Sequence, residues 1–283
     1  MILIADSGST KCSWAVCDSN GEIKEIIKTI GFNPNFINKE IIINNLNDSK
    51  LIYIKNKISQ VYFYGAGCSS EDNNNFIKRS LETFFKNANI NVNHDINGAC
   101  YAMYNGKNNI TCILGTGSNS CFYDGNNIIE YAPSLGYIIG DEGSGNRFGK
   151  EILNMYFNKR LPEELNQKFK KKYEINIDKL KEKIYKNSRP NMYLATFFPF
   201  ISENKRHPLI NEIIDKILED FFQIHIMCFK DFKKLEVNFT GSVAFYLKEE
   251  IYKKAKQYNL QIGNIVQDPI KRLILYHFNK NDN

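Results

Sequence analysis

Short apolar runs that stop at glycine, serine, aspartate or asparagine dominate the first half of the chain. These runs are too short for typical helices and are rich in β-branched residues, so they predict strands. Longer stretches with apolar residues at roughly helical spacing predict helices between them. The predicted strands cover residues 1–5, 12–17, 22–30, 61–65, 90–94, 110–114, 119–123 and 127–131, and the predicted helices cover 37–54, 71–88 and 98–104.

One pattern of strand, turn, strand, turn and strand occurs twice, over residues 1–30 and again over 110–131. The first copy contains the turn Asp6-Ser7-Gly8-Ser9-Thr10, and the second contains Gly115-Thr116-Gly117-Ser118. A supersecondary unit that repeats in this way suggests duplicated domains. We therefore expect two similar loops that face one cleft.

The second half of the chain is more helical. Its predicted helices cover 142–157, 178–185, 192–198, 211–229, 243–258 and 269–277, with one more from Pro162, and its predicted strands cover 235–239 and 261–266. The expected fold is an α/β protein with two mixed five-stranded sheets, flanking helices and an interdomain cleft. We expect an N-terminal lobe at 1–112 and a C-terminal lobe at 113–267, with the terminal helix of 268–283 packing back on the first lobe.

Composition narrows the class of protein. Of the 283 residues 43% are hydrophobic and 24% are charged, which is typical of a soluble globular protein. The net charge of +6 comes from 37 basic and 31 acidic residues. The basic residues are dispersed, and the densest run, Lys168–Lys172, falls on a predicted solvated helix. We therefore expect no nucleic-acid partner.

The seven cysteines form no CxxC pair and show no metal-ligand spacing. Most lie in apolar, strand-like surroundings, which favours buried free thiols in a reducing cytosol. No apolar window approaches the length of a membrane span, and the first residues run directly into a motif instead of a signal-peptide core. We therefore expect a cytoplasmic protein without a membrane partner.

The two loops could bind an anion. Glycine lets the backbone approach a phosphate, and successive N–H groups form a concave donor site. A tight hairpin turn explains Gly115–Ser118 equally well when that segment is considered alone. Asp6 precedes the first turn, where a carboxylate beside a phosphate needs a cation between them, so it predicts Mg²⁺ binding through water. The alternative is an Asx-turn residue that caps its own loop.

Asp95 follows a predicted strand and precedes a predicted helix. A carboxylate there could act as a general base toward a substrate hydroxyl, but a helix N-cap is an equally good interpretation. Strand alternation directs the side chain of His94 away from that of Asp95. Further along, Asp141 and Glu142 lie on a glycine-rich segment that suits hydrogen bonds to sugar hydroxyls or, alternatively, a capped helix start.

With these motifs placed, the chain resembles the BadF/BadG/BcrA/BcrD ATPase-type family, in its branch of N-acetylglucosamine kinases within the actin-like and sugar-kinase superfamily. Six segments in the family's order carry the resemblance. They are ADSGSTKCSWAV at 5–16, GFNPNF at 31–36, HDINGA at 94–99, LGTGSNS at 114–120, LGYIIGDEGSGNRFGK at 135–150 and FTGSVAF at 239–245. The family's first loop often has glycine where this chain has Ser7, while Gly8 and Thr10 match the family pattern.

The resemblance implies duplicated ribonuclease H-like, actin-like ATPase domains that bind ATP, Mg²⁺ and a sugar between the lobes. It makes Asp95 the catalytic base and Asp6 the residue that holds Mg²⁺. The implied phosphate-binding residues are Gly8, Ser9, Thr10, Lys11, Gly115, Thr116, Gly117 and Ser118. The implied adenosine contacts are Gly241 and Ser242, and the implied sugar contacts are Asn33, Asp95, Gly136 and Asp141.

The expected function is ATP-dependent phosphorylation of an amino sugar, with N-acetylglucosamine at its 6-hydroxyl as the first choice. Glucosamine and N-acetylmuramic acid are alternative acceptors. The rival functions are an ATPase that activates a dehydratase through a bridging iron–sulfur cluster, and a sugar-responsive sensor or repressor without catalysis. The expected partners are the sugar and the nucleotide, and a homodimer is the default expectation for the oligomeric state.

Overall fold

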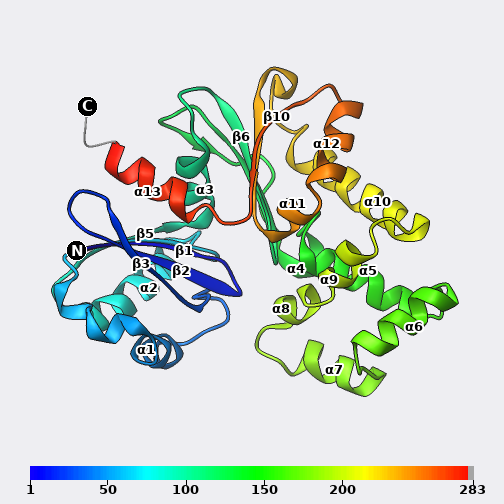
Figure 1. Cartoon of the computed structure of the whole chain (residues 1–283), viewed down its shortest axis with the longest axis horizontal. Coiled ribbons are helices and arrows are strands. Elements are labelled where there is room, and N and C mark those ends of the chain that lie inside the picture. The colour runs from blue at the N-terminus through cyan, green and yellow to red at the C-terminus, as the bar shows by residue number, and fades with distance from the viewer. Residues whose placement is uncertain (280–283) are drawn as a thin grey trace. The chain divides into compact units, whose positions relative to one another are not determined.

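The computed structural model describes residues 1–279, which form two compact units (Figure 1). The first unit contains residues 1–111, 121–129 and the segment from Asp268 onward, and the second contains 112–120 and 130–267. Residues 280–283 of the predicted terminal segment lie outside the described residues. The lobe limits at 1–112 and 113–267 stay a prediction.

The first unit is built on a five-stranded sheet in the order β3-β2-β1-β4-β5. Strand β1 pairs antiparallel with β2 and parallel with β4, while β2 pairs antiparallel with β3, and β4 pairs parallel with β5. The strands are β1 (Ile2–Ser7), β2 (Lys11–Cys17), β3 (Ile23–Ile30), β4 (Gln60–Gly65) and β5 (Asn89–His94). The mixed sheet therefore leaves the carboxyl ends of β1, β4 and β5 at one edge.

Both faces of this sheet are covered, so alternate residues of β1 enter different cores. Leu3 and Ala5 join the core under α1 (Lys39–Asn47) and α2 (Glu71–Phe84), where Trp14 packs against three phenylalanine rings. Ile4 enters the core on the opposite face. The Trp14 ring is fully buried, and its indole N–H donates to Thr29 Oγ1 at 2.9 Å.

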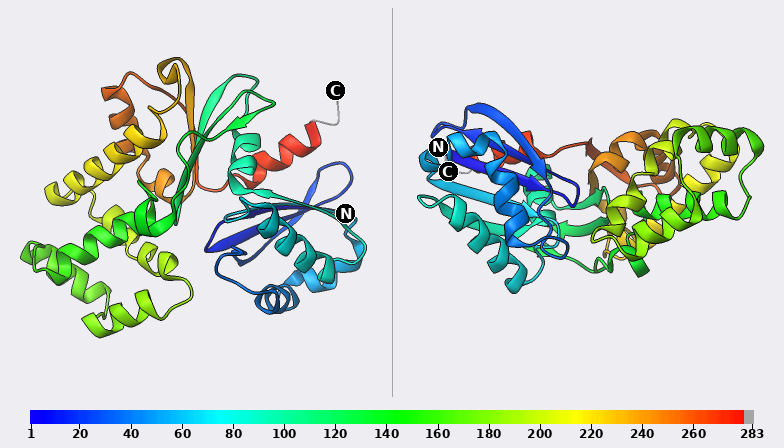
Figure 2. Two further views of the ribbon diagram at one scale, coloured as in Figure 1. Left: turned by 180° about the vertical axis from the view of Figure 1, so that it is seen from behind. Right: turned by 90° about the horizontal axis from the view of Figure 1, so that it is seen from below.

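The opposite face is covered by α3 (Asp95–Met103) and α13 (Ile270–Asn279), as Figures 1 and 2 show. Ile270, Leu273 and Ile274 recur at helical spacing along α13 and pack with Ile4 in one buried cluster. A helix from the far end of the sequence thus completes the core of the N-terminal sheet.

The second sheet has the order β10-β9-β6-β7-β8. Numbered from its own first strand, this is the same order as in the first sheet, so the duplicated fold predicted from the sequence is confirmed. Strands β9 and β10 pair parallel, and β7 and β8 pair antiparallel. The strands are β6 (Asn109–Leu114), β7 (Ser118–Tyr123), β8 (Ile128–Ile129), β9 (Glu236–Thr240) and β10 (Gln261–Val266).

The remaining helices belong to the second unit. They are α4 (Gly136–Ile139), α5 (Gly145–Phe157), α6 (Glu163–Lys172), α7 (Ile177–Tyr185), α8 (Pro190–Ala195), α9 (Phe198–Glu203), α10 (Pro208–His225), α11 (Ser242–Tyr246) and α12 (Lys248–Gln257). Short 3₁₀ turns are η1 (Lys50–Tyr53), η2 (Lys55–Lys57) and η3 (Phe232–Lys234). Helix α10 buries a stripe from Ile210 to His225 at helical spacing, as its apolar pattern predicts.

Several predicted element limits are wrong for identifiable reasons. The helix predicted over 37–54 ends at Asn47, and a separate 3₁₀ turn capped by Ser49 follows. The helix predicted from residue 142 begins at Gly145, because Asp141 and Gly143 have left-handed φ values of 60° and 74°. The strand predicted over 127–131 shrinks to two residues, because Asp124 holds the preceding turn through the backbone N–H groups of residues 126 and 127.

Other limits shift in the helical half. The predicted helix 192–198 is two short helices, α8 and α9, and the predicted helix 243–258 is divided at Leu247 into α11 and α12. The predicted helix 211–229 begins earlier and ends earlier, as α10. Within residues 1–279, no helix combines the length and apolarity needed to span a membrane.

A buried lysine joins α10 to α12. Lys254 is 3% exposed, and its Nζ lies 2.8 Å from Asp215 Oδ1 and 2.9 Å from Glu219 Oε2. We expect Lys254→Ala to lower the free energy of unfolding by about 2 kcal/mol, because it removes buried packing and leaves two acids without their shared cation. Chemical denaturation should detect this loss, and exposed Lys253→Ala is the matched control. A Lys254→Ala protein as stable as the control would contradict the expectation.

The same cluster should make the stability of the fold depend on pH in the acid range. Burial alone would raise the pKa of Glu219, but hydrogen bonds from Tyr258, Gln223 and Lys254 outweigh it and lower the pKa to about 2. A lowered carboxyl pKa stabilises the fold above the ordinary value of about 4.5, and that contribution is lost as the pH falls toward 2. Denaturation midpoints are measured between pH 5 and pH 2 for the parent protein and for Glu219→Gln. We expect the midpoint to fall less steeply with decreasing pH in the variant than in the parent protein.

Candidate functional site

The first predicted phosphate loop is a tight turn. Strand β1 extends to Ser7 and β2 begins at Lys11, so only Gly8, Ser9 and Thr10 form the connection. Asp6 lies within β1, where its partner across the sheet is Ser13. Asp6 is therefore one of the last residues of β1, at the sheet edge where ligands of open α/β sheets bind.

The segment after β3 holds this turn in place. A Cβ atom on Gly31 would lie 1.9 Å from the carbonyl oxygen of Gly8, so only glycine permits the close approach of the two backbones. The Gly31 N–H donates to the Thr10 carbonyl at 3.1 Å, and Asn33 Nδ2 donates to Ser9 Oγ at 3.1 Å. Asn33, predicted to contact the sugar, thus touches the first loop.

Ser7, where the family often has glycine, has a structural partner. Its side chain is fully buried, and its Oγ accepts a hydrogen bond from the Phe32 N–H at 2.9 Å. The hydroxyl therefore faces the segment that braces the turn. Serine at this position therefore adds a hydrogen bond, from the Phe32 N–H, that helps to hold the first loop in place.

Negative charge gathers around Asp6. Burial, followed by the nearby charges of Asp268 and Asp95, raises the pKa of Asp6 to about 8, with Lys11 opposing the shift. Asp268 begins the segment of α13, accepts a hydrogen bond from Ser13 Oγ at 3.0 Å and lies 3.7 Å from Lys11 Nζ. A cation beside Asp6 would relieve the repulsion among these carboxylates and favour the charged form of Asp6.

This donor set fits Mg²⁺ held largely through water. Hard cations take carboxylate oxygens, and Mg²⁺ usually keeps several water ligands beside one or two carboxylates. Among residues 1–279, no three His, Cys, Asp or Glu side chains are grouped closely enough to form a complete protein cage for a metal ion. Asp6, predicted from the sequence to hold Mg²⁺, could do so together with water and phosphate oxygens.

Asp95 is the first residue of α3, directly after β5. The N-cap of α3 is His94, whose side chain makes no capping bond, so the N-cap interpretation of Asp95 is wrong. The prediction that the two side chains point apart is also wrong, because His94 Nε2 lies 3.1 Å from Asp95 Oδ1. Strand alternation ends at His94, and the helical backbone of Asp95 turns its carboxylate back toward the imidazole.

The second predicted phosphate loop joins β6 to β7 through Gly115, Thr116 and Gly117. The Gly115 N–H donates to the Gly117 carbonyl at 2.9 Å, which is the backbone of a tight hairpin turn. The start of α5 fixes this turn from outside, because the N–H groups of Gly145 and Asn146 donate to the carbonyls of Gly115 at 2.8 Å and Thr116 at 3.1 Å. The hairpin interpretation therefore describes the backbone, and it leaves a ligand-binding role open.

Asp141 supports the same loop from its left-handed backbone position. It is 6% exposed, and its Oδ1 accepts from the Ser118 N–H at 3.2 Å while its Oδ2 accepts from Asn146 Nδ2 at 2.6 Å. Burial raises the pKa of Asp141 against these two hydrogen bonds. A Cβ on Gly117 would lie 2.9 Å from Asp141 Oδ1, so the glycine makes room for the carboxylate. Because its N–H is already bonded, Ser118 could contact a ligand only through its hydroxyl.

We expect Asp141→Asn to destabilise the second loop. An asparagine amide cannot accept at both of its ends, so one of the two buried donors, from Ser118 or Asn146, loses its acceptor. A loss of about 1–3 kcal/mol in the free energy of unfolding follows, measurable by urea denaturation. Asp178→Asn makes the same substitution at an exposed position of the second unit and serves as the control. Equal stability of the two variants would contradict this role.

The turn between β9 and α11 closes on the same loop. Gly241 has a φ of 112°, and a Cβ there would lie 2.3 Å from the carbonyl oxygen of Leu114. Two buried hydroxyls nearby, Ser118 Oγ and Thr240 Oγ1, have no hydrogen-bond partner within the described part of the chain. Buried hydroxyls are normally paired, so these two fit contacts with a ligand. Ser242, predicted beside the adenosine, is the first residue of α11.

Gly136 begins the short helix α4 with a φ of 74°, and a Cβ there would meet no atom within 4 Å. Backbone conformation, not crowding, therefore requires this glycine. The neighbouring α4 side chains Ile138 and Ile139 are exposed.

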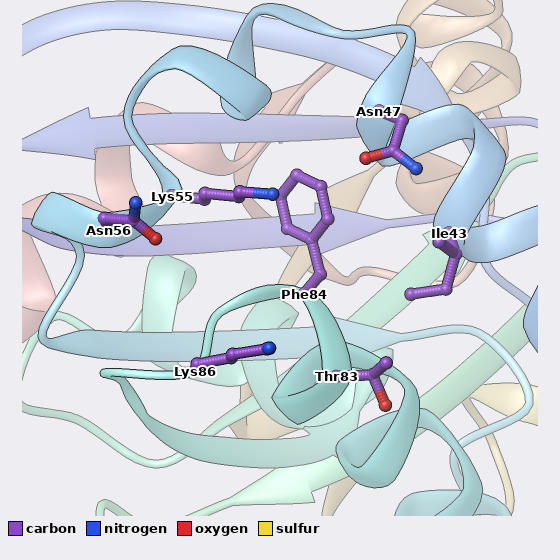
Figure 3. Close-up of a pocket in the computed structure, with 7 residues that line it drawn as sticks. All are labelled: Ile43, Asn47, Lys55, Asn56, Thr83, Phe84 and Lys86. Atoms are coloured by element: carbon purple, nitrogen blue, oxygen red, sulfur yellow. The ribbon is translucent and has the colours of Figure 1, made fainter.

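A pocket of about 340 Å³ in the first unit contains none of the predicted site residues. Figure 3 shows Lys55 directed at the ring of Phe84, with a distance of 5.2 Å from Nζ to the ring centroid. The rest of the lining is mainly polar side chains from α1, η2 and the end of α2. The pocket therefore gives no independent support to the predicted ligand site.

Three residues that contact or lie near the predicted loops have no role assigned from the sequence. Gly31 and Asn146 lie inside two of the six family segments, but their contacts with the loops depend on tertiary structure. Asp268 precedes Pro269 at a predicted helix start, which is a capping signal. That signal alone could not place Asp268 beside Lys11 and Ser13, since more than 250 residues separate them.

Comparison with solved structures gives full-length matches. A protein of Porphyromonas gingivalis named as a putative N-acetylglucosamine kinase is 33% identical, with a TM-score of 0.92 and coverage of 99% of this chain and 100% of that one. One of Chromobacterium violaceum with the same description is 14% identical, with a TM-score of 0.62 and coverage of 97% and 98%. A ROK family glucokinase of Streptomyces griseus, in complex with glucose and AMPPNP, is 14% identical, with a TM-score of 0.54 and coverage of 98% of both chains.

The last two matches show a shared fold only. No family model matches the chain, and no curated protein sequence matches it. The match at 33% identity extends over both five-stranded sheets and over all the segments described above. The chain therefore belongs to the sugar kinases with the duplicated actin-like fold.

Proposed function

We propose that the protein transfers the terminal phosphoryl group of ATP to an amino sugar, with the 6-hydroxyl of N-acetylglucosamine as the acceptor. The observation that carries this proposal is the 33% identity, over the whole chain, to a protein named as a putative N-acetylglucosamine kinase. The glucokinase of the same fold that was solved with glucose and AMPPNP supports a nucleotide and a sugar as the ligand classes.

In this proposal Asp95 is the general base. Its carboxylate begins α3 at the carboxyl end of β5, so a stable helix and a paired strand fix its position. It accepts or orients the proton of the sugar hydroxyl as that oxygen attacks phosphorus. His94, 3.1 Å away, restricts the orientation of the carboxylate.

The two loops supply hydrogen-bond donors for the phosphates. The first unit contributes Gly8, Ser9, Thr10 and Lys11, and the second contributes Thr116, Gly117 and the hydroxyl of Ser118. Gly115, whose N–H is bonded to the Gly117 carbonyl, lets the backbone approach the phosphate closely. Donors that are fixed before the substrate arrives stabilise the charge of the transferring group without reorganisation. The bracing of each loop by neighbouring backbone supports this preorganised role.

Asp6 would hold Mg²⁺ through water, and the bound ion would neutralise charge on the phosphate oxygens. Lys11 lies near the same edge and contributes further positive charge. Gly241 and Ser242 would lie against the adenosine. Asn33, Gly136 and Asp141 would join Asp95 in binding the sugar.

A sugar panel tests the proposal. Purified protein is incubated with ATP, Mg²⁺ and one of N-acetylglucosamine, glucosamine, N-acetylmuramic acid or glucose, and ADP release is followed by a coupled assay. We expect the highest kcat/KM with N-acetylglucosamine, and NMR of the product should place the phosphate on the oxygen of carbon 6. Sugar binding without ADP release would instead favour a non-catalytic sensor, and a better substrate in the panel would reassign the acceptor.

The dehydratase-activating ATPase is a weaker candidate. Its bridging cluster needs cysteine thiolates directed at a partner subunit. Cys100 and Cys121 are fully buried and face each other, so they do not favour this function. Cys228, which follows α10, is exposed, but no second cysteine lies near it in the sequence.

A further inference from the structure

Two cysteines far from each other in sequence meet inside the first unit. The sulfur of Cys100 on α3 lies 2.8 Å from the sulfur of Cys121 on β7. Both side chains are 0% exposed. The sequence gives no sign of this pair, because 21 positions separate the two residues and no short motif joins them.

The packing around the pair holds the two sulfurs together. Cys100 lies on the buried side of α3, on the same helical face as Ile96 and Met103. The rings of Tyr101 and Tyr104 on and after α3 both contact Tyr123 of β7, with centroid distances of 5.8 and 5.0 Å. Ring contacts thus join the helix and the strand beside the cysteine pair, and large separation of the sulfurs would require breaking them.

We propose that Cys100 and Cys121 form an oxidisable dithiol that closes to an intramolecular disulfide. A disulfide has an S–S length of about 2.05 Å and usual Cα separations of about 4.4–6.8 Å, so the sulfurs need to approach by only about 0.8 Å. Because α3 and β7 already place the two side chains face to face, no rearrangement of backbone elements is needed.

The oxidant class that fits the site is a hydroperoxide. With hydrogen peroxide, one thiol loses its proton and its sulfur attacks a peroxide oxygen. The O–O bond breaks, the released hydroxide takes up that proton to form water, and a sulfenic acid remains on the sulfur. The second sulfur then attacks the sulfenic sulfur, the S–O bond breaks, and a second water carries away the hydroxyl and the remaining proton. Two electrons pass from the two sulfurs to the peroxide, which is reduced to water. Complete burial of both thiols favours this small oxidant over a bulky disulfide such as oxidised glutathione.

The disulfide would close a loop of the chain over residues 101–120, which contains β6 and the whole second phosphate loop, Gly115–Ser118. A cross-link around a segment of this length restricts the unfolded chain and so stabilises the folded one. The disulfide therefore braces the base-bearing helix α3 against the strand that leaves the second loop. This inference is independent of the proposed sugar substrate, because it concerns thiol chemistry that requires neither ATP nor sugar.

The test uses the full chain in a Cys228→Ser background, which removes the exposed cysteine and its intermolecular reactions. The reduced protein is treated with hydrogen peroxide, then unfolded and alkylated, and its intact mass and peptides are determined by mass spectrometry. We expect the loss of two hydrogen atoms, two fewer alkylated thiols and a peptide that links Cys100 to Cys121. Dithiothreitol should reverse all three changes, and the oxidised protein should melt several degrees higher than the reduced protein.

Matched variants locate the bond. Cys100→Ala should abolish the linked peptide and the rise in melting temperature, whereas Cys112→Ala, which removes a buried cysteine of β6, should retain both. The peptide map of the parent protein decides the matter even if a variant fails to fold. Complete alkylation of all six remaining thiols after peroxide, or a disulfide that joins other cysteines, would overturn the proposal.

Discussion

Asp95→Asn is expected to abolish phosphoryl transfer to the sugar while the protein stays folded. Asparagine keeps the size of the side chain but cannot accept the hydroxyl proton, and loss of a general base costs about 10²- to 10⁴-fold in rate. The N-cap of α3 is His94 and not Asp95, and asparagine is close in shape to aspartate, so the substitution should leave the helix intact. The measurement is kcat with the best sugar of the panel, together with the affinity for ATP, which should change little.

Asp72→Asn is the matched control for this variant. Asp72 is an exposed acid in the first turn of α2, in the same unit and in a similar helical position. It should retain normal turnover. If Asp95→Asn also turns over at a near-normal rate, then Asp95 is not the base, and His94 becomes the first residue to examine because it contacts the same carboxylate.

Gly31→Ala should damage the first loop more severely than any substitution within the loop itself. Its new Cβ would lie 1.9 Å from the Gly8 carbonyl oxygen and 2.7 Å from the carbonyl carbon of Ser9, so one backbone segment must move. Overpacking against backbone typically costs about 1–3 kcal/mol and sometimes more. A displaced Gly8–Thr10 turn should also raise the KM for ATP by about 10-fold or more, since about 1.4 kcal/mol of lost binding corresponds to 10-fold.

Gly106→Ala is the control that separates the effect of the steric clash at Gly31 from the general effect of replacing a glycine by alanine. Gly106 has a φ of 86° and no atom within 4 Å of an added Cβ, so the substitution adds backbone strain without a clash. We expect it to lower stability by about 1 kcal/mol and to leave the KM for ATP unchanged. Indistinguishable ATP kinetics for the two variants would show that the contact of Gly31 with the loop does not matter for nucleotide binding.

The fold could be predicted because its signals are local and repeated. Alternation and turn residues mark the same three-strand pattern twice, and the two sheets have the same strand order. Where element limits were wrong, backbone conformation and local hydrogen bonds at single residues decided them. The glycine at position 98, inside α3, has a tertiary reason, because a Cβ there would lie 2.8 Å from the ring of Tyr64. No sequence pattern reports that contact.

The site was predictable only in part for the same reason. Motifs identified the glycine turns, Asp6 and Asp95 as chemically interesting, because residue type and spacing carry that information. The partners of Asp141 and the approach of Asp268 to Lys11 depend on how distant segments pack. The pairing of Cys100 with Cys121 is the clearest case, since it joins a helix to a strand without any motif.

The helix α13 has a consequence for synthesis on the ribosome. Ile270, Leu273 and Ile274 complete the apolar face around Ile4, yet they are translated after the entire second unit. During translation the part of this apolar face that α13 covers must therefore stay exposed while more than half of the polypeptide emerges. Nascent chains that stop before residue 270 should bind chaperones and aggregate readily, because exposed apolar surface is what both processes recognise.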